Sequence, residues 1–280
     1  MAEARLRDRG VVQVAGEDAE SFLQGLVTTS VTGLATGEAR FGALLTPQGK
    51  IVVDFFITPA TGIEGGGFLL DVPQALGPDL VRKLSFYKLR ARVTIRDLSD
   101  QLSVTAVWDQ DVPTGSIVFK DPRAPALGWR VIGSNEVGSD QAFYDAHRIA
   151  LGIPEGGRDY AYGDAFPHEA VMDQLHGVAF DKGCYVGQEV VSRMQHRGTA
   201  RTRIVSVTYA GPKPADGAEI IAGDKVLGTF GSGADGAGVA LVRLDRLGEA
   251  FDSGSAILAG GNVVAITKPA WATYPWPGEA

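Results

Sequence analysis

The spacing of hydrophobic positions predicts a mixture of strands and helices up to about residue 200. Alternation of apolar and polar residues is typical of half-buried strands, and a period near 3.6 is typical of amphipathic helices. The expected strands are 11–14, 40–45, 51–58, 68–72, 92–98, 102–108, 117–119 and 129–132. The expected helices are 17–26, 74–87, 139–151 and 188–195. Thr46-Pro47-Gln48-Gly49 joins two of the strands into a hairpin.

From Thr202 onward the pattern changes to short strands separated by Gly, Pro and Asp turns, which is typical of a small β-barrel or sandwich. The expected strands are 204–209, 219–221, 225–230, 238–242, 256–259 and 262–266. We therefore expect an α+β chain in two parts. Region 1–200 would hold two intertwined α+β modules of mixed antiparallel sheets and helices, and 201–280 a small C-terminal β-barrel domain, with the boundary near Ala200.

A glycine-rich stretch at 231–236 matches the dinucleotide-binding pattern GxGxxG, but that site needs a following helix inside a βαβ unit. Here the stretch joins two short strands, so a hairpin explains it better. The four histidines are scattered and no CxxC pair occurs, which argues against a permanent metal site.

The amino-acid composition limits the classes of protein to which this chain can belong. The 280 residues are 45% hydrophobic, which is enough for a sizeable core, and the longest apolar runs are too short to span a bilayer. Residues 1–9 are charged and lack the apolar core of a secretory signal. A single cysteine precludes an internal disulfide and fits a reducing compartment. We expect a cytoplasmic protein without a membrane partner, or a mitochondrial matrix protein if the source is eukaryotic.

The net charge of −7 argues against general nucleic-acid binding, because phosphate contacts need a basic surface. Two stretches oppose this balance: 82–96 holds six basic residues and no acid, and 181–203 has a local charge of +3. Each is either a solvated face or part of a site for an anion. A carboxylate-bearing ligand would suit arginine, whose planar guanidinium binds carboxylate through two hydrogen bonds.

Cys184 is the candidate for chemistry. A free cysteine is most often a small buried hydrophobe, but this one lies between Gly183 and Gly187, in what should be a tight loop before a helix. The helix N-terminus and Lys182 both favour a thiolate, the form that acts as a nucleophile or binds metal. A conventional iron-sulfur cluster takes four thiolates. Any cluster at Cys184 would therefore be shared with a partner or completed by small thiols.

Residues 182–189, KGCYVGQE, resemble the signature K-G-C-F/Y-x-G-Q-E of the YgfZ family. These folate-binding proteins are related to the aminomethyltransferase (T-protein) of the glycine cleavage system. Segments 11–26, 127–130 and 148–155 also resemble the family, as does the β-rich end. The resemblance implies a T-protein-like, tetrahydrofolate-binding body with a C-terminal barrel. It also implies a role in assembling or repairing iron-sulfur (4Fe-4S) proteins, including enzymes that modify tRNA.

The resemblance assigns roles to residues. Cys184 would be a transient thiolate ligand for iron or a redox nucleophile, and Lys182 would lower its pKa. The remaining loop residues would shape the loop or orient the helix start: Gly183, Tyr185, Gly187, Gln188 and Glu189. The candidates for the folate site, each equally well explained as structural, are Asp54, Asp71, Trp129, Arg130 and Arg148. The expected partners are folate and iron-sulfur client or assembly proteins.

Two alternatives remain open. T-proteins carry an aspartate in an N-A-x-x-x-x-D-like stretch after a strand, and the corresponding residues 69–73, LLDVP, lack that pattern. This departure favours an assembly factor over the first alternative, a tetrahydrofolate-dependent aminomethyl or one-carbon transferase. The second alternative is an RNA-binding adaptor that uses the two basic stretches, against which the acidic net charge counts.

Overall fold

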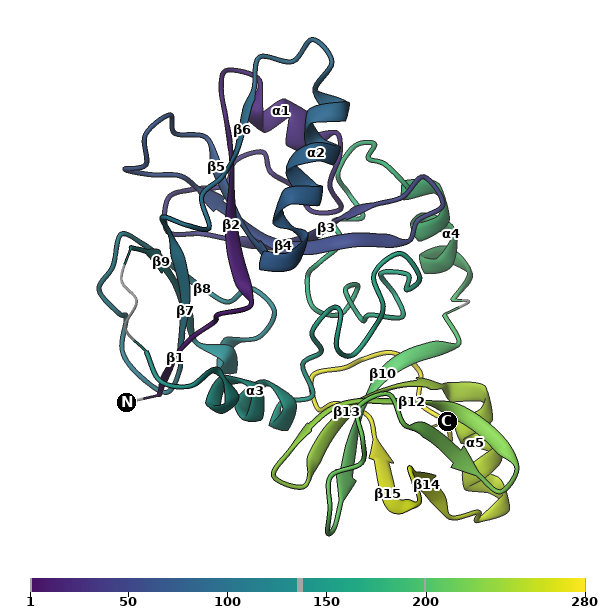
Figure 1. The fold of residues 1–280 in the computed structure, drawn as a ribbon. Coiled ribbons are helices and arrows are strands. Elements are labelled where there is room, and N and C mark those ends of the chain that lie inside the picture. Colours follow the sequence, from purple (N-terminus) through teal and green to yellow (C-terminus); the bar gives the residue numbers. More distant parts are fainter. Residues whose placement is uncertain (1, 135–137, 199, 280) are drawn as a thin grey trace. The chain divides into compact units, whose positions relative to one another are not determined.

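The computed structural model describes residues 2–134, 138–198 and 200–279 (Figure 1). The chain forms two compact units, each made of two segments. Unit 1 comprises Met1–Tyr144 and Leu175–Gln188, and unit 2 comprises Asp145–Gln174 and Glu189–Ala280. The expected boundary near Ala200 falls inside unit 2, because residues 145–174 group with the barrel and 175–188 group with the N-terminal sheets.

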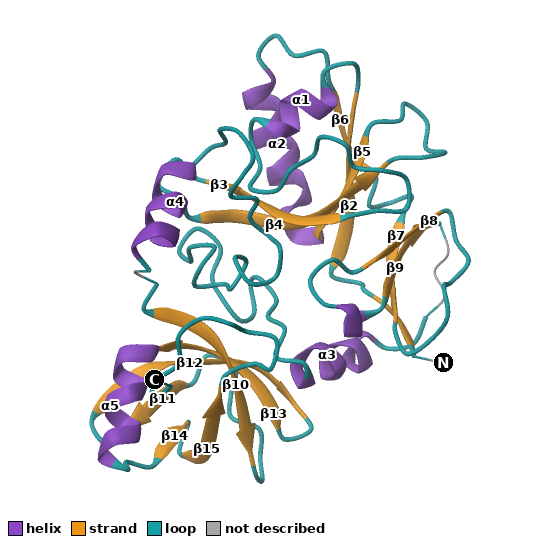
Figure 2. Cartoon of the chain, turned by 180° about the vertical axis from the view of Figure 1, so that it is seen from behind, coloured by secondary structure: helices purple, strands orange, loops and turns teal. Residues whose placement is uncertain are grey.

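A five-stranded sheet forms the larger part of unit 1. Its strands, in spatial order, are β3 (Arg40–Leu45), β4 (Ile51–Pro59), β5 (Phe68–Pro73), β2 (Arg9–Ala15) and β6 (Thr94–Asp97). All neighbouring pairs are antiparallel. The β3–β4 hairpin expected from its Pro-Gly turn is confirmed and is seen from behind in Figure 2.

Helices pack on this sheet and bury a hydrophobic core with it. They are α1 (Ala19–Gln24), the 3-10 turn η1 (Gln74–Leu76) and α2 (Gly77–Lys88). Leu80 and Leu84, one helical turn apart on α2, are buried in the same cluster as Leu23 of α1 and Phe55 of β4. In Figure 1, α2 lies along a face of the sheet. The spacing of these two leucines is that of an amphipathic helix with one buried side.

A second, four-stranded sheet completes unit 1. Its order is β1 (Glu3–Arg5), β7 (Ser103–Val107), β9 (Trp129–Gly133) and β8 (Ile117–Lys120), and the 3-10 turn η2 (Pro125–Leu127) precedes β9. The sequence predicted both β6 and β7 but not their partners. β6 pairs with β2 in the first sheet, whereas β7 pairs with β1 and β9 in the second.

Unit 2 contains a closed six-stranded barrel. Its order is β10 (Thr202–Tyr209), β13 (Ala237–Arg243), β12 (Lys225–Ala234), β11 (Glu219–Ala222), β14 (Ile257–Ala259) and β15 (Asn262–Thr267). The stretch 231–236 ends β12 and turns into β13, which confirms the hairpin interpretation over dinucleotide binding. The predicted α+β fold with a C-terminal barrel is confirmed.

Three further helices are α3 (Gln141–Ala150), α4 (Gln188–Arg197) and α5 (Leu244–Ser253). Sequence reading missed α5, which buries Leu247 and Ala250 and ends at Gly254 in the left-handed conformation. Its glycine at position 248 and flanking turn residues hid the helical period. Among the described residues, no helix has the length and apolar character needed to cross a membrane.

Candidate functional site

The loop that carries Cys184 lies against the segment that follows α1, within unit 1. Thr28 donates its hydroxyl to the Gly177 carbonyl at 2.6 Å and accepts the amide of Ala179 at its own carbonyl at 2.9 Å. The Thr28 hydroxyl also accepts the Ala43 amide of β3 at 2.8 Å. A fully buried threonine thus joins the loop to the sheet.

Lys182 adds a second attachment. Its ammonium donates to the carbonyls of Gln24, Val27 and Thr29 at 2.8, 2.6 and 2.8 Å, and lies 5.3 Å from the centre of the Tyr185 ring. Burial lowers the pKa of Lys182 to about 8. The three carbonyls match the three N–H donors of a protonated amine and favour the charged form. Lys182 therefore holds the loop in place.

Tyr185 and Gly187 fix the other side of the thiol. Tyr185 is buried, which raises its pKa to about 12. Gly187 has φ of 81°, and a Cβ there would come within 2.6 Å of the Thr46 carbonyl oxygen in the β3–β4 turn. Only glycine fits this position. Gly183, in contrast, has open space around it and is not left-handed, so the loop does not require a glycine there.

Cys184 itself is exposed and free. The chain therefore presents one thiol to solvent between two attached residues, rather than burying it as core packing. Gln188 begins α4, and its amide reaches the Tyr185 carbonyl at 3.3 Å. Glu189 pairs with Arg193 one turn along the same helix, at 2.5 Å, on an exposed face.

Three of the five folate candidates lie together, in a buried network of charges. Asp71 accepts from Arg9 Nε and from Arg130 Nη1, both at 2.6 Å, and Asp54 lies 3.9 Å from Arg9. Arg130 continues to Asp121 at 3.1 Å, and Asp121 pairs with Arg123 at 2.8 Å. Three arginines and three aspartates balance in charge.

Aromatic rings complete this network. The Arg130 guanidinium lies 3.9 Å from the centre of the Phe56 ring, and that of Arg123 lies 4.8 Å from it. The Tyr144 hydroxyl accepts from both arginines at 2.9 and 3.0 Å. Burial alone would raise the pKa of Asp121, but Arg123 and Arg130 outweigh it and lower the pKa to about 2. The network thus joins the two sheets of unit 1.

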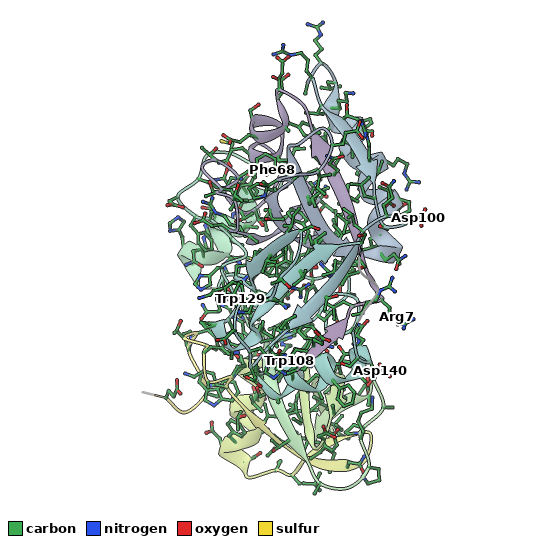
Figure 3. The ribbon with its side chains drawn as sticks, turned by 90° about the vertical axis from the view of Figure 1, so that its left-hand side faces the viewer. Arg7, Phe68, Asp100, Trp108, Trp129 and Asp140 are labelled. Carbon is green, nitrogen blue, oxygen red and sulfur yellow. The ribbon has the colours of Figure 1, made fainter. Side chains whose placement is uncertain are left out.

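The other two folate candidates lie elsewhere. Trp129, labelled in Figure 3, precedes Arg130 on β9 and is half-buried, with the Lys120 ammonium 5.1 Å from its ring centre. Neighbouring strand residues face opposite sides of a sheet, so Trp129 points away from the charge network.

Arg148 belongs to unit 2, where it is almost fully buried. It donates to Asp159 at 2.9 Å, to Ser232 of β12 at 3.1 Å and to the Ile153 carbonyl at 3.2 Å. These contacts attach α3 to the barrel, so Arg148 is a structural residue of that unit.

A polar pocket of about 560 Å³ opens in unit 1 beside the Cys184 loop. We call it the Arg40 pocket. It is lined by Gln24, Thr29, Ser30, Thr32, Arg40, Phe41, Pro122, His176, Ala179, Asp181 and Lys182. Sequence reading missed Arg40 and His176. The only local signal at His176 is structural, a φ of 59° that is rare for a residue with a side chain.

Arg40 has N–H groups that make no hydrogen bond within the described chain. Its Nη1 donates to the Ser30 carbonyl at 2.7 Å, and within the described chain Nε and Nη2 have no protein partner. The guanidinium can therefore bind a carboxylate that enters the pocket. In the described ranges, no three His, Cys, Asp or Glu side chains come together in a group that could hold a metal ion.

Comparison with known proteins identifies the family. Residues 7–108 match the model of the GCVT N-terminal domain, and residues 201–274 match that of the CAF17 C-terminal beta-barrel domain. The iron-sulfur cluster assembly factor IBA57 homolog, mitochondrial, of Mycosarcoma maydis is 31% identical over 99% of this chain and 85% of its own length. The chain belongs to the IBA57 family. The Mus musculus and Homo sapiens members are 31% and 30% identical, each over 87% of this chain and 78% of their own length.

The fold of this IBA57-family chain is that of an aminomethyltransferase. The glycine cleavage system aminomethyltransferase T of Bartonella henselae superposes with a TM-score of 0.72, covering 98% of this chain and 87% of the other. Its sequence identity is 14%, so this likeness concerns the fold alone.

We predict that Gly187→Ala destabilises this member of the IBA57 family by about 1–3 kcal/mol, because the substitution forces a side chain into the left-handed conformation against the Thr46 carbonyl. Urea unfolding monitored by fluorescence measures the change. Gly183→Ala is the matched control and should alter the unfolding free energy by less than about 0.5 kcal/mol, since its Cβ meets open space. Equal effects of the two substitutions would contradict the assignment.

We also predict acid sensitivity from Asp121. Its folded pKa is about 2 against 3.8 for the ordinary group, so its ion pairs stabilise the fold above pH 3.8 and this stabilisation is lost as pH falls towards 2. The loss amounts to about 2 kcal/mol. Circular dichroism of urea unfolding at successive pH values measures it. Asp121→Asn should be less stable at neutral pH and should show a flatter pH dependence over this window.

Proposed function

We propose that this chain is a folate-binding factor for the assembly or repair of iron-sulfur proteins, in which Cys184 serves as a transient thiolate ligand. Iron or a cluster is the cargo. Because the chain has one cysteine and a cluster takes four thiolates, the other ligands come from a partner protein or small thiols. The names of the IBA57 relatives, iron-sulfur cluster assembly factors of mitochondria, support this role.

One observation carries the proposal: Cys184 is exposed in a loop whose neighbouring residues are fixed. The Lys182 ammonium has three carbonyl acceptors, and Gly187 packs on the β3–β4 turn. A thiol kept for packing would be buried. A thiol that receives cargo from another protein needs to be accessible and held in one place. The resemblance of 182–189 to the YgfZ signature supports the same role.

Lys182 acts as a positioning residue in this proposal. Its ammonium is engaged with the carbonyls of Gln24, Val27 and Thr29, so its main contribution is to hold the loop. Binding of iron by Cys184 releases the thiol proton, which makes loading more favourable as pH rises.

Folate would bind in the Arg40 pocket. The volume of about 560 Å³ falls within the range of pockets that hold cofactors. Arg40 can hold the glutamate carboxylate of the ligand, and Phe41 offers an aromatic surface for its flat rings. Asp54, Asp71 and Arg130 are already paired with one another or with Arg9, so they support the fold beside the pocket.

The clients of this factor would be 4Fe-4S enzymes, including those that modify tRNA, in the mitochondrial matrix or the cytoplasm according to the source. A one-carbon transferase is disfavoured because residues 69–73 lack the aspartate-bearing pattern of T-proteins. The aspartate within this stretch, Asp71, is fully buried and bonded to two arginines, so it is not available to a substrate.

We predict that Cys184→Ser abolishes the ability of the gene to restore 4Fe-4S enzyme activities in a deletion strain, because the hydroxyl does not replace a thiolate ligand. The variant should unfold at the same urea concentration as the natural protein, since position 184 is exposed. Aconitase activity in cell extracts measures the effect. Full restoration by Cys184→Ser or Cys184→Ala would show that the thiol plays no part.

We predict that Arg40→Met weakens tetrahydrofolate binding by roughly tenfold to a hundredfold, the range expected for losing charge-assisted hydrogen bonds to a carboxylate. Isothermal titration calorimetry measures it. Arg82→Met, an exposed arginine outside the pocket, is the control and should bind normally. Neither heat nor thermal stabilisation on adding tetrahydrofolate to the natural protein would remove the cofactor from the proposal.

A further inference from the structure

A second hollow of about 430 Å³ lies in unit 1 between α2 and the β3–β4 hairpin. We call it the α2 hollow. Its walls are mostly apolar and aromatic, with two cations at the edge: Leu44, Leu45, Thr46, Pro47, Val52, Arg82, Lys83, Phe86 and Tyr87. It is separate from the Arg40 pocket, with which it shares no lining residue.

Two large apolar side chains are exposed on this part of unit 1, of which Phe86 lines the hollow and Leu89 follows two residues after the lining residue Tyr87. Phe86 on α2 is 78% exposed, and Leu89, directly after the helix, is 88% exposed. While these side chains are exposed to water, the fold lacks the favourable free energy that their burial would give. Neighbouring Leu80 and Leu84 are buried, so the exposed pair lies on the side of the helix that no other part of the described chain covers.

The backbone at Leu89 strengthens the case for a functional surface. Its φ is 44° and its ψ is −103°, a conformation natural for glycine and strained for leucine. The chain thus holds a branched apolar side chain outward at a position where glycine would fit better. Strained conformations of this kind concentrate at binding and switch regions.

The basic residues near the hollow indicate the chemistry of the segment that binds there. Residues 80–96 hold six basic residues and no acid. Arg92 pairs with Glu17 and Asp18, and Arg82 pairs with Asp79. Four cations are left over, for which the described chain supplies no acidic partner: Lys83, Lys88, Arg90 and Arg96. Lys83 lines the hollow, and Lys88 and Arg90 follow its lining residue Tyr87 in the chain. An apolar hollow with cations of this kind at and near its edge is complementary to an apolar side chain flanked by carboxylates.

The hollow also adjoins the thiol loop. Leu45 and Thr46 line it, and the same two residues contact Gly187, whose Cβ would lie 3.1 Å from Leu45 and 2.6 Å from Thr46. One hairpin therefore forms a wall of the hollow and the support of the Cys184 loop. A protein docked in the hollow would lie next to that loop.

We propose that the α2 hollow docks an acidic segment, anchored by an apolar side chain, of the protein that exchanges iron or a cluster with Cys184. The inference rests on the proposed function for the identity of the cargo. The docking surface itself rests on the exposed residues, the strain at Leu89 and the unpaired cations.

The test uses the full chain in a deletion strain. Two variants remove the surface: Lys83→Glu/Lys88→Glu/Arg90→Glu and Phe86→Ser/Leu89→Gly. Each should lower restored 4Fe-4S enzyme activity by about tenfold or more, the effect of losing about 1.4 kcal/mol of docking free energy. The reaction of Cys184 with a thiol reagent and the affinity for tetrahydrofolate should not change.

Matched controls separate docking from folding. Lys83→Arg/Lys88→Arg/Arg90→Lys keeps the charge and should restore full activity. Phe143→Ser removes another exposed aromatic of unit 1, 63% exposed, and should also be active. Leu89→Gly alone should unfold at the same or a higher urea concentration while losing activity, because glycine accepts the backbone conformation. A purely structural role for Leu89 predicts the opposite change in stability.

The occupant is tested by placing a photo-crosslinking phenylalanine analogue at Phe86 in growing cells. We expect an adduct on an acidic segment of another protein, formed equally with Cys184→Ser and lost with the charge-reversed variant. A chain that crosslinks only to itself, or that binds anionic phosphatidylserine vesicles through these cations, would overturn the proposal in favour of self-association or a membrane. Full activity of both surface variants alongside an inactive Cys184→Ser would overturn docking while leaving the proposed function in place.

Discussion

Three backbone carbonyls after α1, those of Gln24, Val27 and Thr29, point to one ammonium, that of Lys182. A carbonyl removed from water without a hydrogen-bond partner costs about 1–3 kcal/mol, so this arrangement depends on the lysine. The irregular loop that carries Cys184 has three other attachments: the hydrogen bonds of Thr28 to Gly177 and Ala179, the buried Tyr185 ring, and the approach of Gly187 to the hairpin. Cys184 is exposed because the residues on either side of it are held. Without that ammonium the loop would lose the three hydrogen bonds nearest to Cys184.

The buried ion pairs stabilise the contact between the two sheets of unit 1, whereas Lys182 holds the loop. Arginines and aspartates from β2, β4, β5, β9 and the turn after β8 neutralise one another around Phe56. Buried pairs of this kind are costly to break, because removing one partner leaves an unpaired charge in the interior. The network therefore fixes how the two sheets of unit 1 meet. Arg40, whose Nε and Nη2 have no partner in the described chain, lines one pocket with Asp181 and Lys182 of the thiol loop.

Much of the fold could be predicted from the sequence. Local periodicity predicted nearly every strand and the helix α2, because these depend on residues close in the chain. Which strands pair with one another could not be predicted, because β6 and β7 are neighbours in sequence but belong to different sheets. The helix α5 escaped because glycine interrupts its pattern.

The candidate site likewise has features that nearby residues reveal and features that depend on residues distant in the chain. The single cysteine and Gly187 could be recognised from the sequence, and the left-handed conformation of Gly187 explains why a glycine is needed. The role of Lys182 could not, because its partners lie more than 150 residues away in the chain. From the sequence alone, Asp54, Asp71 and Arg130 are equally well explained as folate contacts and as structural residues. Only the structure reveals that such charges are paired with each other.

Hydrogen exchange of the loop measures directly whether the Lys182 ammonium holds it in place. Lys182→Met keeps the length of the side chain and removes the ammonium, and Lys120→Met, at an exposed lysine, is its control. Mass spectrometry of peptides covering 24–29 and 177–188 should show faster amide exchange in Lys182→Met than in the natural protein, with exchange in β2, β4 and β5 unchanged. Exchange in those two peptides that is the same in all three proteins would contradict the account, since the loop would then hold its place without the lysine.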